Sequence, residues 1–464
     1  MNILQMLHPG DKTALIQGSC RITYSQLIDS GRRFAGALRR QGIGKNSNVL
    51  VFVPLSIDLY TALIGAWTLG ACATFIDFSR GAKFVSDSIE RLKPDIIVCD
   101  NVTKFVRLIH PEMRTIKALH VNSRRESIEA EKLVPEHPAI LTFTSGSTGS
   151  PKAAVRTHGF LIGQYNVLSK HLDYDESHID LGTLPVFTLA NLAAHMTTLL
   201  PHKSYRSKIN ARQLAKKMNH EGVTRVICSP TLIARLLEHS SLPHLKSAYL
   251  GGAPVYPGML KKVPAGVDLH IIYGSTEAEP ISSIRWADVD KADRQKIACG
   301  EGLPVGAIVP QIECCIGAFK EILVSGDTVL KGYLDGIGDS ESKIHEDGKV
   351  WHRTGDAGYF DKNGNLWLLG RVSQSICDEF DTLHPFCVEC VLDAHFGIRG
   401  AALLRNGERV VVVEKGAVDS IRALAVLNPL HIRKIIFVGK IPMDKRHAAK
   451  IDYAKLIYQL DNLL

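Results

Sequence analysis

The chain has 464 residues, 45% of them hydrophobic and 22% charged, which is ordinary for a soluble globular protein and suggests two or more domains. Its 55 lysines and arginines against 47 aspartates and glutamates give a formal net charge of +8. This modest excess favours anionic ligands such as nucleotides, or a weak attraction to acidic membranes. Because the sequence has no lysine- or arginine-rich run, we expect no nucleic-acid partner.

Helical and strand-like segments alternate through the first half of the chain. Thr23 followed by Gln26 is a capping-box signature, and apolar residues recur at helical spacing from Leu27 until Gly42. Buried β-rich runs are expected at 48–54, 71–77, 95–100, 225–230 and 268–274. This alternation predicts an α/β fold with parallel sheets covered by helices on both faces.

Two stretches are nearly free of charge but are punctuated by helix-breaking or polar residues. Leu59 to Ile76 contains Gly65 and Gly70, and Leu181 to Pro201 contains Pro185. Each is better explained as a buried helix beside a buried strand, so no transmembrane span is expected. The N-terminus also lacks a basic segment followed by an apolar run, so we expect no signal peptide and a cytoplasmic location.

The ten cysteines are scattered, as expected for reduced thiols in a cytosolic enzyme. Cys387 and Cys390 form a C-x-x-C pair with His384 and His395 nearby. A zinc site usually needs four well-placed ligands, and a second close cysteine pair is missing, so helix packing is the favoured interpretation.

From about Gln311 the strand-like runs come closer together, and "DKNGN" (Asp361 to Asn365) is a turn signal. The residues after Arg371 resemble a small α+β unit. The position of this boundary depends mainly on the family resemblance described below.

The segment "TFTSGSTGSPK" (Thr142 to Lys152) follows the strand-like run Ala139 to Phe143. Gly146 and Gly149 permit backbone torsions that other residues resist, so the loop can turn its N–H groups inward as an anion nest. Lys152 adds a cation, and hydroxyl donors come from Ser145, Ser147 and Thr148. A polyphosphate is the natural guest, although a plain surface loop is an equally good explanation of this segment alone. Neither the Walker A pattern nor the G-x-S-x-G elbow fits.

Three later segments offer complementary groups. "YGSTEAEP" (Tyr273 to Pro280) supplies an aromatic ring that could stack on a base, and its Glu277 could bind Mg²⁺. Asp356 follows a glycine turn, where a carboxylate can accept both ribose hydroxyls, and Arg371 ends a "GR" pair. Each segment alone could be turn chemistry, but their order and separation are distinctive.

In this order the motifs resemble those of the adenylate-forming superfamily, which includes acyl-CoA synthetases, peptide-synthetase adenylation domains and firefly luciferase. "TSGSTGSPK" is similar to its phosphate loop, and "YGSTE", "TGD" and "GR" to its later motifs. "GGAP" (Gly251 to Pro254) is similar to the segment that lines the adenine and acyl sites. The resemblance covers nearly the whole chain. It implies a large N-terminal domain of helix-covered sheets, residues 1–371, and a small mobile α+β C-terminal domain, residues 372–464.

The resemblance also implies ATP and Mg²⁺ as cofactors. The phosphate loop would hold ATP through Thr144, Ser145, Gly146, Ser147, Thr148, Gly149 and Lys152. Tyr273 would lie against the adenine, and Asp356 would hold the ribose with Arg371 beside it. The same comparison assigns nucleotide contacts to Gly251, Gly252, Ala253, Gly274 and Ser275.

Three residues are implied to be catalytic. Thr276 would contact phosphate and Glu277 would bind Mg²⁺. Lys450, in "IPMDKRHAAKID", resembles the C-terminal lysine that reaches into the site for adenylation. A carboxylate must approach a triphosphate of the same charge, so cations that neutralise the α-phosphate and align the attack are required. A lysine on a mobile domain implies that closure completes the site, whereas Lys450 taken alone could be a solvated helix lysine.

In this family the small domain rotates between the two half-reactions, and the hinge position is usually Asp or Lys. Ser373 occupies that position here, which is compatible with rotation because a hinge needs only to absorb a torsion change.

The sequence says less about the acid that is activated, and about the group that accepts it, than about the nucleotide site. Amino-acid-activating members carry an aspartate in the region that corresponds to Leu184 to Met196, and this chain has no acid there. Phe187, Leu189 and Leu192 would form either an apolar wall for a fatty acid or part of the core.

CoA-using members carry a glycine-containing loop after the "GR" arginine, but Val372 to Cys390 contains no glycine. "GRVSQS" and "DKRHAAKID" are similar to olefin β-lactone synthetases, in which the β-hydroxyl of the acid itself displaces AMP. Three acceptors therefore stay open: CoA in a fatty acid–CoA ligase-like reaction, the hydroxyl of a β-hydroxy acid, and an acyl carrier protein. A non-catalytic nucleotide-binding relative is disfavoured because Lys152, Glu277, Asp356 and Lys450 are all present.

Overall fold

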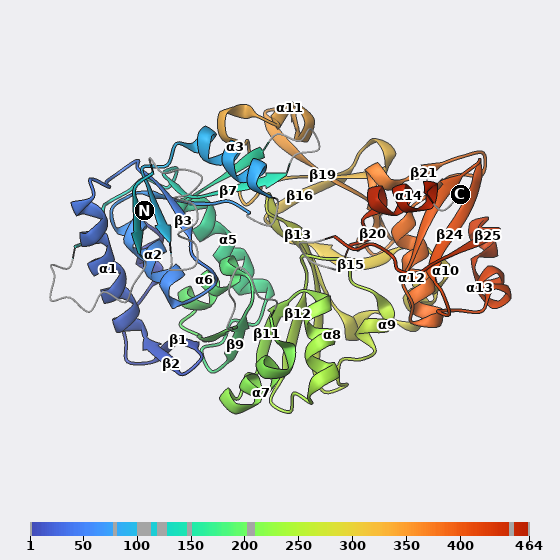
Figure 1. The fold of residues 1–464 in the computed structure, drawn as a ribbon, viewed down its shortest axis with the longest axis horizontal. Helices are drawn as coiled ribbons and strands as arrows, with labels where there is room; N and C mark the ends of the chain where they lie inside the picture. Colours follow the sequence, from blue (N-terminus) through green and yellow to red (C-terminus); the bar gives the residue numbers. More distant parts are fainter. Residues whose placement is uncertain are drawn as a thin grey trace. The chain divides into compact units, whose positions relative to one another are not determined.

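The computed structural model describes residues 2–77, 81–99, 113–117, 128–145, 151–201, 209–444 and 450–462, without the side chains of Thr144 and Ser145. Two compact units are found. The first comprises Met1–Ile227, Leu242–Leu245 and Asp327–Lys343, and the second comprises Cys228–Ser241, Lys246–Gly326 and Ile344–Leu464 (Figure 1).

The first unit contains a six-stranded sheet in the order β6–β5–β3–β4–β7–β8, parallel except for the final pair. Its strands are β3 (Asn48–Phe52), β4 (Cys72–Phe75), β5 (Ile96–Cys99), β6 (Thr115–Lys117), β7 (Pro138–Ser145) and β8 (Pro151–Thr157). The predicted runs at 48–54, 71–77 and 95–100 are thus confirmed as neighbouring parallel strands.

The other strands of this unit follow the order β2–β1–β10–β9–β11, parallel except for β1 and β2. They are β1 (Thr13–Gln17), β2 (Cys20–Thr23), β9 (Ile179–Gly182), β10 (Thr197–Leu200) and β11 (Arg225–Cys228). The helices are α1 (Tyr24–Arg40), α2 (Ile57–Thr68), α3 (Ala82–Leu92), α5 (His158–His171), α6 (Pro185–Ala193), α7 (Ala211–Glu221) and the short α11 (Asp339–Ser342).

The first helix begins as its sequence predicts. The Thr23 hydroxyl accepts the Gln26 N–H at 3.2 Å, and the Gln26 side chain accepts the Thr23 N–H at 2.9 Å. This reciprocal capping box satisfies two backbone donors at the start of α1.

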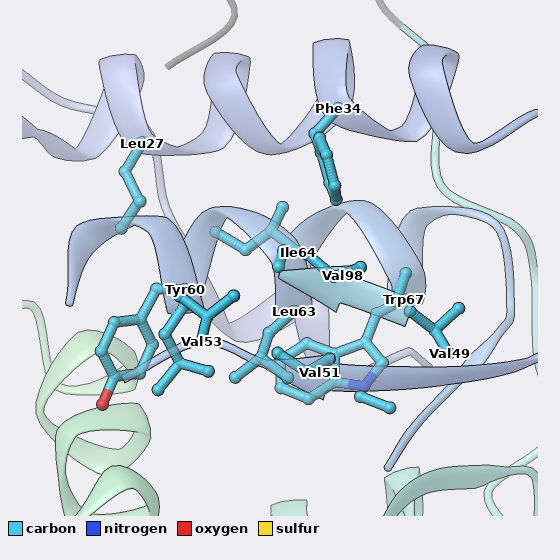
Figure 2. Close-up of a cluster of buried hydrophobic side chains, with 14 of the residues drawn as sticks. Leu27, Phe34, Val49, Val51, Val53, Tyr60, Leu63, Ile64, Trp67 and Val98 are labelled. Atoms are coloured by element: carbon cyan, nitrogen blue, oxygen red, sulfur yellow. The ribbon is translucent and has the colours of Figure 1, made fainter. Parts of the chain in front are cut away.

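Helices α1 and α2 pack closely because each presents a glycine at the crossing. A Cβ added to Gly31 would lie 2.3 Å from Cγ2 of Ile64, and one added to Gly65 would lie 2.8 Å from Cδ1 of Phe34. Figure 2 shows Leu27 and Phe34 of α1 pointing toward α2. The two glycines therefore allow a contact distance that an alanine would prevent.

The opposite face of α2 covers the sheet. Trp67 is fully buried and donates its indole N–H to the Ala139 carbonyl at 2.9 Å, within a core that also contains Val49, Val51 and Val98 (Figure 2). The prediction of a buried helix beside a buried strand is confirmed for this stretch and for α6, which lies between β9 and β10 in the chain. Among the described helices, none is long and apolar enough to cross a membrane.

The second unit carries strands in the order β12–β13–β14–β15–β20–β19–β17–β16, with β12 and β13 parallel and the later pairs antiparallel. They are β12 (Ser247–Leu250), β13 (Asp268–Ser275), β14 (Ala278–Arg285), β15 (Leu303–Ile308), β16 (Ile312–Ile316), β17 (Glu321–Gly326), β19 (Lys349–Phe360) and β20 (Leu366–Arg371). Strand β18 (Lys343–Glu346) pairs with β19. The helices here are α8 (Pro230–His239), α9 (Pro257–Leu260) and α10 (Lys291–Cys299). The predicted change of texture near Gln311 corresponds to this antiparallel region, and the predicted turn at Asp361 joins β19 to β20.

The chain ends in a small α+β part of the second unit, coloured red in Figure 1. A sheet in the order β23–β24–β25 carries helices α12 and α13. The elements are β21 (Ile376–Cys377), β22 (Thr382–Leu383), α12 (Pro385–Phe396), β23 (Gly400–Arg405), β24 (Glu408–Glu414), α13 (Ser420–Leu427), β25 (Lys434–Val438) and α14 (Tyr453–Asp461). The predicted fold class, α/β with a large sheet-based N-terminal part and a small C-terminal part, is confirmed. The boundary at residue 371 and the mobility of the small part stay predictions.

A charged cluster attaches the β21–β22 hairpin to the C-terminal sheet. Arg409 of β24 pairs through Nε with Asp378 at 2.6 Å and through Nη2 with Asp381 at 2.5 Å. The hydrogen bond from Arg409 lowers the pKa of Asp378 to about 2. Ser375 precedes β21 and His384 follows β22. At this open end of the hairpin the Ser375 hydroxyl and Nδ1 of His384 form a 3.1 Å hydrogen bond.

The C-x-x-C pair lies on α12. Cys387 and Cys390 are both buried and free, and burial raises the pKa of the Cys387 thiol to about 12. The described residues include no group of three or more His, Cys, Asp or Glu side chains placed to hold a metal ion.

Candidate active site

The second unit contains a cavity of about 170 Å³ whose wall is assembled from segments far apart in the sequence. Five of these segments contain residues named from the sequence or polar residues beside them. They contribute Gly252 and Ala253, Tyr273 and Gly274, Asp356, Arg371 and Gln374, and Lys450 and Tyr453. Of the residues predicted from sequence, the structure thus brings Gly252, Ala253, Tyr273, Gly274, Asp356, Arg371 and Lys450 into one wall.

A hydrogen-bonded triad of Tyr273, Asp356 and Arg371 forms the charged part of this wall. The Tyr273 hydroxyl donates to Oδ2 of Asp356 at 3.0 Å, and Nη1 of Arg371 contacts Oδ1 at 2.9 Å. Asp356 and Arg371 are paired in register on the antiparallel strands β19 and β20, which places the two charges side by side. Gly355 lies in the left-handed region at φ +71°, which glycine adopts readily.

The charges within the triad keep Tyr273 protonated and Arg371 ionised. Burial and the charge of Asp356 raise the pKa of Tyr273 well above its usual value, so the phenol stays protonated and donates. Burial alone would lower the pKa of Arg371, but the charge and hydrogen bond of Asp356, with Tyr273 and Glu277, raise it. The guanidinium is therefore a permanent cation in the wall of the cavity.

Hydrogen bonds from Thr354 and Glu321 hold the turn that carries Asp356. Thr354 donates its hydroxyl to the Ile322 carbonyl at 2.8 Å and accepts the Asp356 N–H at 3.1 Å. The buried carboxylate of Glu321 accepts the Gly355 N–H at 3.1 Å and pairs with Arg353 at 2.7 Å. These bonds fix the direction of the Asp356 side chain.

The Gly251–Pro254 segment runs against β13 beside the cavity. A Cβ on Gly251 would lie 2.9 Å from the Ile272 carbonyl oxygen, so this residue allows the close approach without itself lining the wall. Gly252 lies in the left-handed region at φ +71°, which glycine adopts readily.

Lys450 reaches the same cavity from the C-terminal part. Its backbone is held by Asp444, whose N–H bonds the Lys450 carbonyl at 2.9 Å and whose Oδ1 accepts the Lys450 N–H at 3.2 Å. An antiparallel bridge pairs Met443 with Ile451. The side chain of Lys450 is exposed, so its position in the wall costs little desolvation.

Ser275 ends β13, and Thr276 and Glu277 form the turn to β14; none of the three lines the cavity. The Ser275 hydroxyl accepts the Glu277 N–H at 3.2 Å, and the three side chains are partly exposed. Glu277 contributes to the raised pKa of Arg371, so its carboxylate is electrostatically coupled to the triad.

The phosphate-loop segment belongs to the first unit. Thr144 and Ser145 end β7, and their Cα partners on β8 are Lys152 and Pro151, so the loop joins two antiparallel strands. Gly146, Ser147, Thr148 and Gly149 lie outside the described residues.

Lys152 is buried in the first unit and pairs with an acid that the sequence analysis missed. Its ammonium lies 2.7 Å from Oε2 of Glu341 and 5.7 Å from the centre of the Tyr333 ring. No sequence motif pointed to Glu341, because 189 residues separate it from Lys152.

The apolar residues of 184–196 lie in or against the interior of the first unit. Phe187 and Leu192 are buried, and Leu192 belongs to the main core of the first unit. Leu189 lines a small apolar cavity of about 30 Å³ with Trp67 and Leu161.

Several residues of the second unit's cavity were not predicted from sequence. They are Tyr256, Gln374, Phe386, Glu389 and Tyr453. Glu389 did carry a signal, because it is a lone acid within the apolar run "PFCVECVL", and an acid in such a run is buried with a partner or has a function.

The chain is similar to known proteins of one family. Residues 5–334 match the family model described as AMP-binding enzyme. The olefin β-lactone synthetase of Xanthomonas campestris is 27% identical, with 94% of this chain and 90% of the relative covered. The 2-succinylbenzoate–CoA ligase of Bacillus licheniformis is 25% identical, covering 85% of this chain and 83% of the ligase.

Among solved structures, the O-succinylbenzoate coenzyme A synthetase of Bacillus subtilis in complex with AMP superposes with a TM-score of 0.81 and 20% identity. The match covers 98% of this chain and 96% of the synthetase, which has also been solved with ATP and a magnesium ion. The protein has the fold of these enzymes. Because the family model matches most of its length, the chain belongs to the AMP-binding enzyme family and is an adenylate-forming ligase.

Proposed function

We propose that this enzyme uses ATP and Mg²⁺ to convert a fatty carboxylic acid into an acyl-adenylate, with release of pyrophosphate. One observation carries the proposal: Tyr273, Asp356, Arg371 and Lys450 come from four separate segments and line one cavity. These are the residue types that a nucleotide and a developing phosphate charge require.

The triad can bind the nucleoside. Each carboxylate oxygen of Asp356 accepts one bond, from Tyr273 or from Arg371, and keeps a second lone pair that a ribose hydroxyl can use. Tyr273, Gly252 and Gly274 line the same cavity, where the tyrosine would supply an aromatic ring for a base to lie against. The triad is therefore already organised before a ligand bonds to it, which reduces the ordering cost of binding.

The phosphates and their metal would be held by the remaining residues of the resemblance. Mg²⁺ usually takes one or two carboxylates plus phosphate oxygens and water, so the single carboxylate of Glu277 suits it better than a full protein cage would. Bound there, Mg²⁺ would neutralise phosphate charge. Thr276 and the loop from Thr144 to Lys152 would supply hydroxyl, amide and ammonium donors to the phosphates.

In the reaction a carboxylate oxygen of the acid forms a bond to the α-phosphorus of ATP. The bond between that phosphorus and the oxygen bridging to the β-phosphorus breaks, and pyrophosphate leaves with the electron pair. Lys450 would stabilise the extra charge on the α-phosphoryl oxygens, which is worth a factor of about 10²–10⁴ by analogy with other charge-stabilising donors.

A β-lactone-forming second step is favoured as the fate of the adenylate. Val372 to Cys390 contains no glycine, and the Xanthomonas relative that aligns over nearly the whole chain is an olefin β-lactone synthetase. With a β-hydroxy acid, the hydroxyl oxygen would bond to the acyl carbon, the acyl–oxygen bond to AMP would break, and the hydroxyl proton would pass to solvent. CoA and an acyl carrier protein are the competing acceptors.

Mass spectrometry of the products tests both steps. The protein would be incubated with ATP, Mg²⁺ and a panel of fatty and 3-hydroxy fatty acids, with and without CoA. We expect AMP and pyrophosphate with both acid types, and from the hydroxy acids a product of the acid's mass minus water without CoA.

An acyl-CoA formed only when CoA is added would identify a fatty acid–CoA ligase and exclude the lactone. An absence of AMP and pyrophosphate with every acid, while an acid outside the panel reacts, would overturn the fatty substrate but not the adenylation.

A further inference from the structure

A buried carboxylate joins Lys450's segment to the other side of the cavity. Glu389 lies in the middle of α12, is 7% exposed, and accepts hydrogen bonds from two tyrosines. The Tyr256 hydroxyl donates to Oε2 at 2.5 Å, and the Tyr453 hydroxyl donates to Oε1 at 2.6 Å. Each carboxylate oxygen thus holds a residue from a different segment, and all three residues line the cavity.

The two tyrosines belong to two different segments of the cavity wall. Tyr256 lies two residues after Pro254 and is the residue before α9. Tyr453 is the first residue of α14, three positions after Lys450. Glu389 therefore connects the wall on which the Gly251–Pro254 segment lies to the segment that presents the lysine.

A second carboxylate on the same face of α12 strengthens this contact. Asp393, one helical turn after Glu389, accepts the backbone N–H of Gly258 at the start of α9. A Cβ on Gly258 would lie 2.8 Å from Oδ2 of Asp393, so the close approach needs a glycine. Two acids at i and i+4 hold the Tyr256–Leu260 segment against α12.

We infer that Glu389 is a positioning residue for adenylation: by bonding Tyr256 and Tyr453 together it fixes the position of Lys450 in the wall of the cavity. The inference rests on the proposed role of Lys450 in that reaction. Glu389 itself is not assigned a contact with the reacting atoms, and it acts through the two tyrosines.

The same cluster predicts a pH signature. Burial raises the pKa of Glu389 to about 7, while the hydrogen bonds from Tyr256 and Tyr453 and the charge of Arg399 oppose the rise. The other titratable groups around it are Cys387, Cys390 and Asp393 on its own helix, and Lys450 and Arg371 in the cavity wall.

The pH acts on folding and on the two hydrogen bonds in opposite directions. Because burial raises the pKa of Glu389, its contribution to folding stability is fully present below about 4.5 and is lost as the pH rises through about 7. The tyrosine hydroxyls oppose that rise because they donate to the ionised carboxylate, so we expect the bonds from Tyr256 and Tyr453 to strengthen as Glu389 ionises around pH 7.

The test compares Glu389→Gln, Glu389→Ala and Tyr453→Phe with the wild type, using Glu408→Gln, an exposed residue at the start of β24, as the matched control. The adenylation rate is measured by pyrophosphate release, ATP binding by titration with the nucleotide alone, and folding by thermal melting. Loss of a hydrogen bond to a charged group predicts about a tenfold lower kcat for Glu389→Ala and Tyr453→Phe, with little change in ATP affinity. A variant that combines Glu389→Ala with Tyr453→Phe should have a kcat little lower than that of either single variant, because both changes break the same connection.

Two further readouts separate positioning from a structural role. The ratio of the wild-type rate to the Glu389→Gln rate should rise as the pH rises from 6 to 8, because the amide resembles the protonated acid and cannot ionise to accept both tyrosine hydroxyls. Hydrogen exchange of the 450–456 backbone, followed by mass spectrometry, should quicken in Glu389→Ala and stay unchanged in Glu408→Gln. This exchange measurement does not depend on turnover, so it also decides the inference if the enzyme adenylates none of the acids tried.

Unchanged exchange at 450–456 together with an unchanged kcat in Glu389→Ala would overturn the positioning role. Faster exchange with an unchanged kcat would show that Glu389 holds the segment but that Lys450 has no part in adenylation. That second result would contradict the proposed function of the lysine and therefore the inference built on it.

Discussion

The α1–α2 core of the first unit and the cavity wall of the second use opposite means to hold their side chains. Around Trp67 the packing is almost wholly apolar, and position is set by shape, with Gly31 and Gly65 allowing the helices to touch. Around Asp356 and Glu389, position is set by hydrogen bonds between buried phenols, carboxylates and a guanidinium. Shape complementarity fills space and stabilises, whereas a polar network costs desolvation and in return fixes direction. A small change should therefore cost folding free energy in the first region and rate or affinity in the second.

Lys450→Ala should have the largest effect on the adenylation rate and almost no effect on stability. The side chain is exposed, so its loss should leave the melting temperature almost unchanged. The adenylation rate should fall by about 10²–10⁴ while ATP still binds, because the lysine would act on charge that develops in the transition state. Pyrophosphate release and nucleotide titration measure the two quantities. Lys455→Ala, an exposed lysine of α14, is the control, and a wild-type rate in Lys450→Ala would remove the lysine from the mechanism.

Asp356→Asn should produce an intermediate effect on nucleotide affinity. The amide keeps the size of the carboxylate but loses its charge, so it pairs poorly with Arg371 and offers the ribose only one acceptor oxygen. We expect the KM for ATP to rise by about 10- to 100-fold, from the value of hydrogen bonds to charged groups.

The matched control is Asp347→Asn, an exposed turn residue at φ +50°, where Asn and Asp are both well tolerated. Initial rates over a range of ATP concentrations give the measurement. Equal KM values for the two variants would argue against a ribose contact at Asp356.

Gly31→Ala tests the apolar region and has the smallest expected effect on activity. Alanine at a helix interior normally stabilises by up to about 1 kcal/mol, but here its Cβ would lie 2.3 Å from Ile64. Overpacking of this kind costs about 1–3 kcal/mol of unfolding free energy. Gly163→Ala on α5 is the matched control, because its Cβ would meet Thr328 only at an ordinary 3.7 Å. Denaturant unfolding should show opposite signs for the two variants, and equal signs would mean that α1 and α2 can separate without cost.

Much of the first region could be read from the sequence because its determinants are local. The capping box at Thr23, the strand Asn48–Phe52 and the buried helix Ile57–Thr68 each follow from residues within one element. The tight crossing could not be foreseen, since Gly65 looks like punctuation until Phe34 is placed beside it.

The cavity wall could be predicted only in part. Tyr273, Asp356, Arg371 and Lys450 lie in motifs that resemble those of the family, and all four reach the wall. Glu341 and Glu389 belong to no such motif, because their partners Lys152 and Tyr256 are far away in the chain. Pairing across such distances is decided by tertiary packing, which a single sequence does not display.

The Arg409 cluster bears on which backbone torsions are left to change. With both ends of the loop between β21 and β22 bound to one guanidinium, Asp378 to Asp381 are connected to strand β24 as part of a single body. Ser375 is in turn tied to His384. Any reorientation of the C-terminal part would thus be concentrated in the φ and ψ angles of Val372, Ser373 and Gln374. A small change in these angles would displace atoms far from them by a large distance.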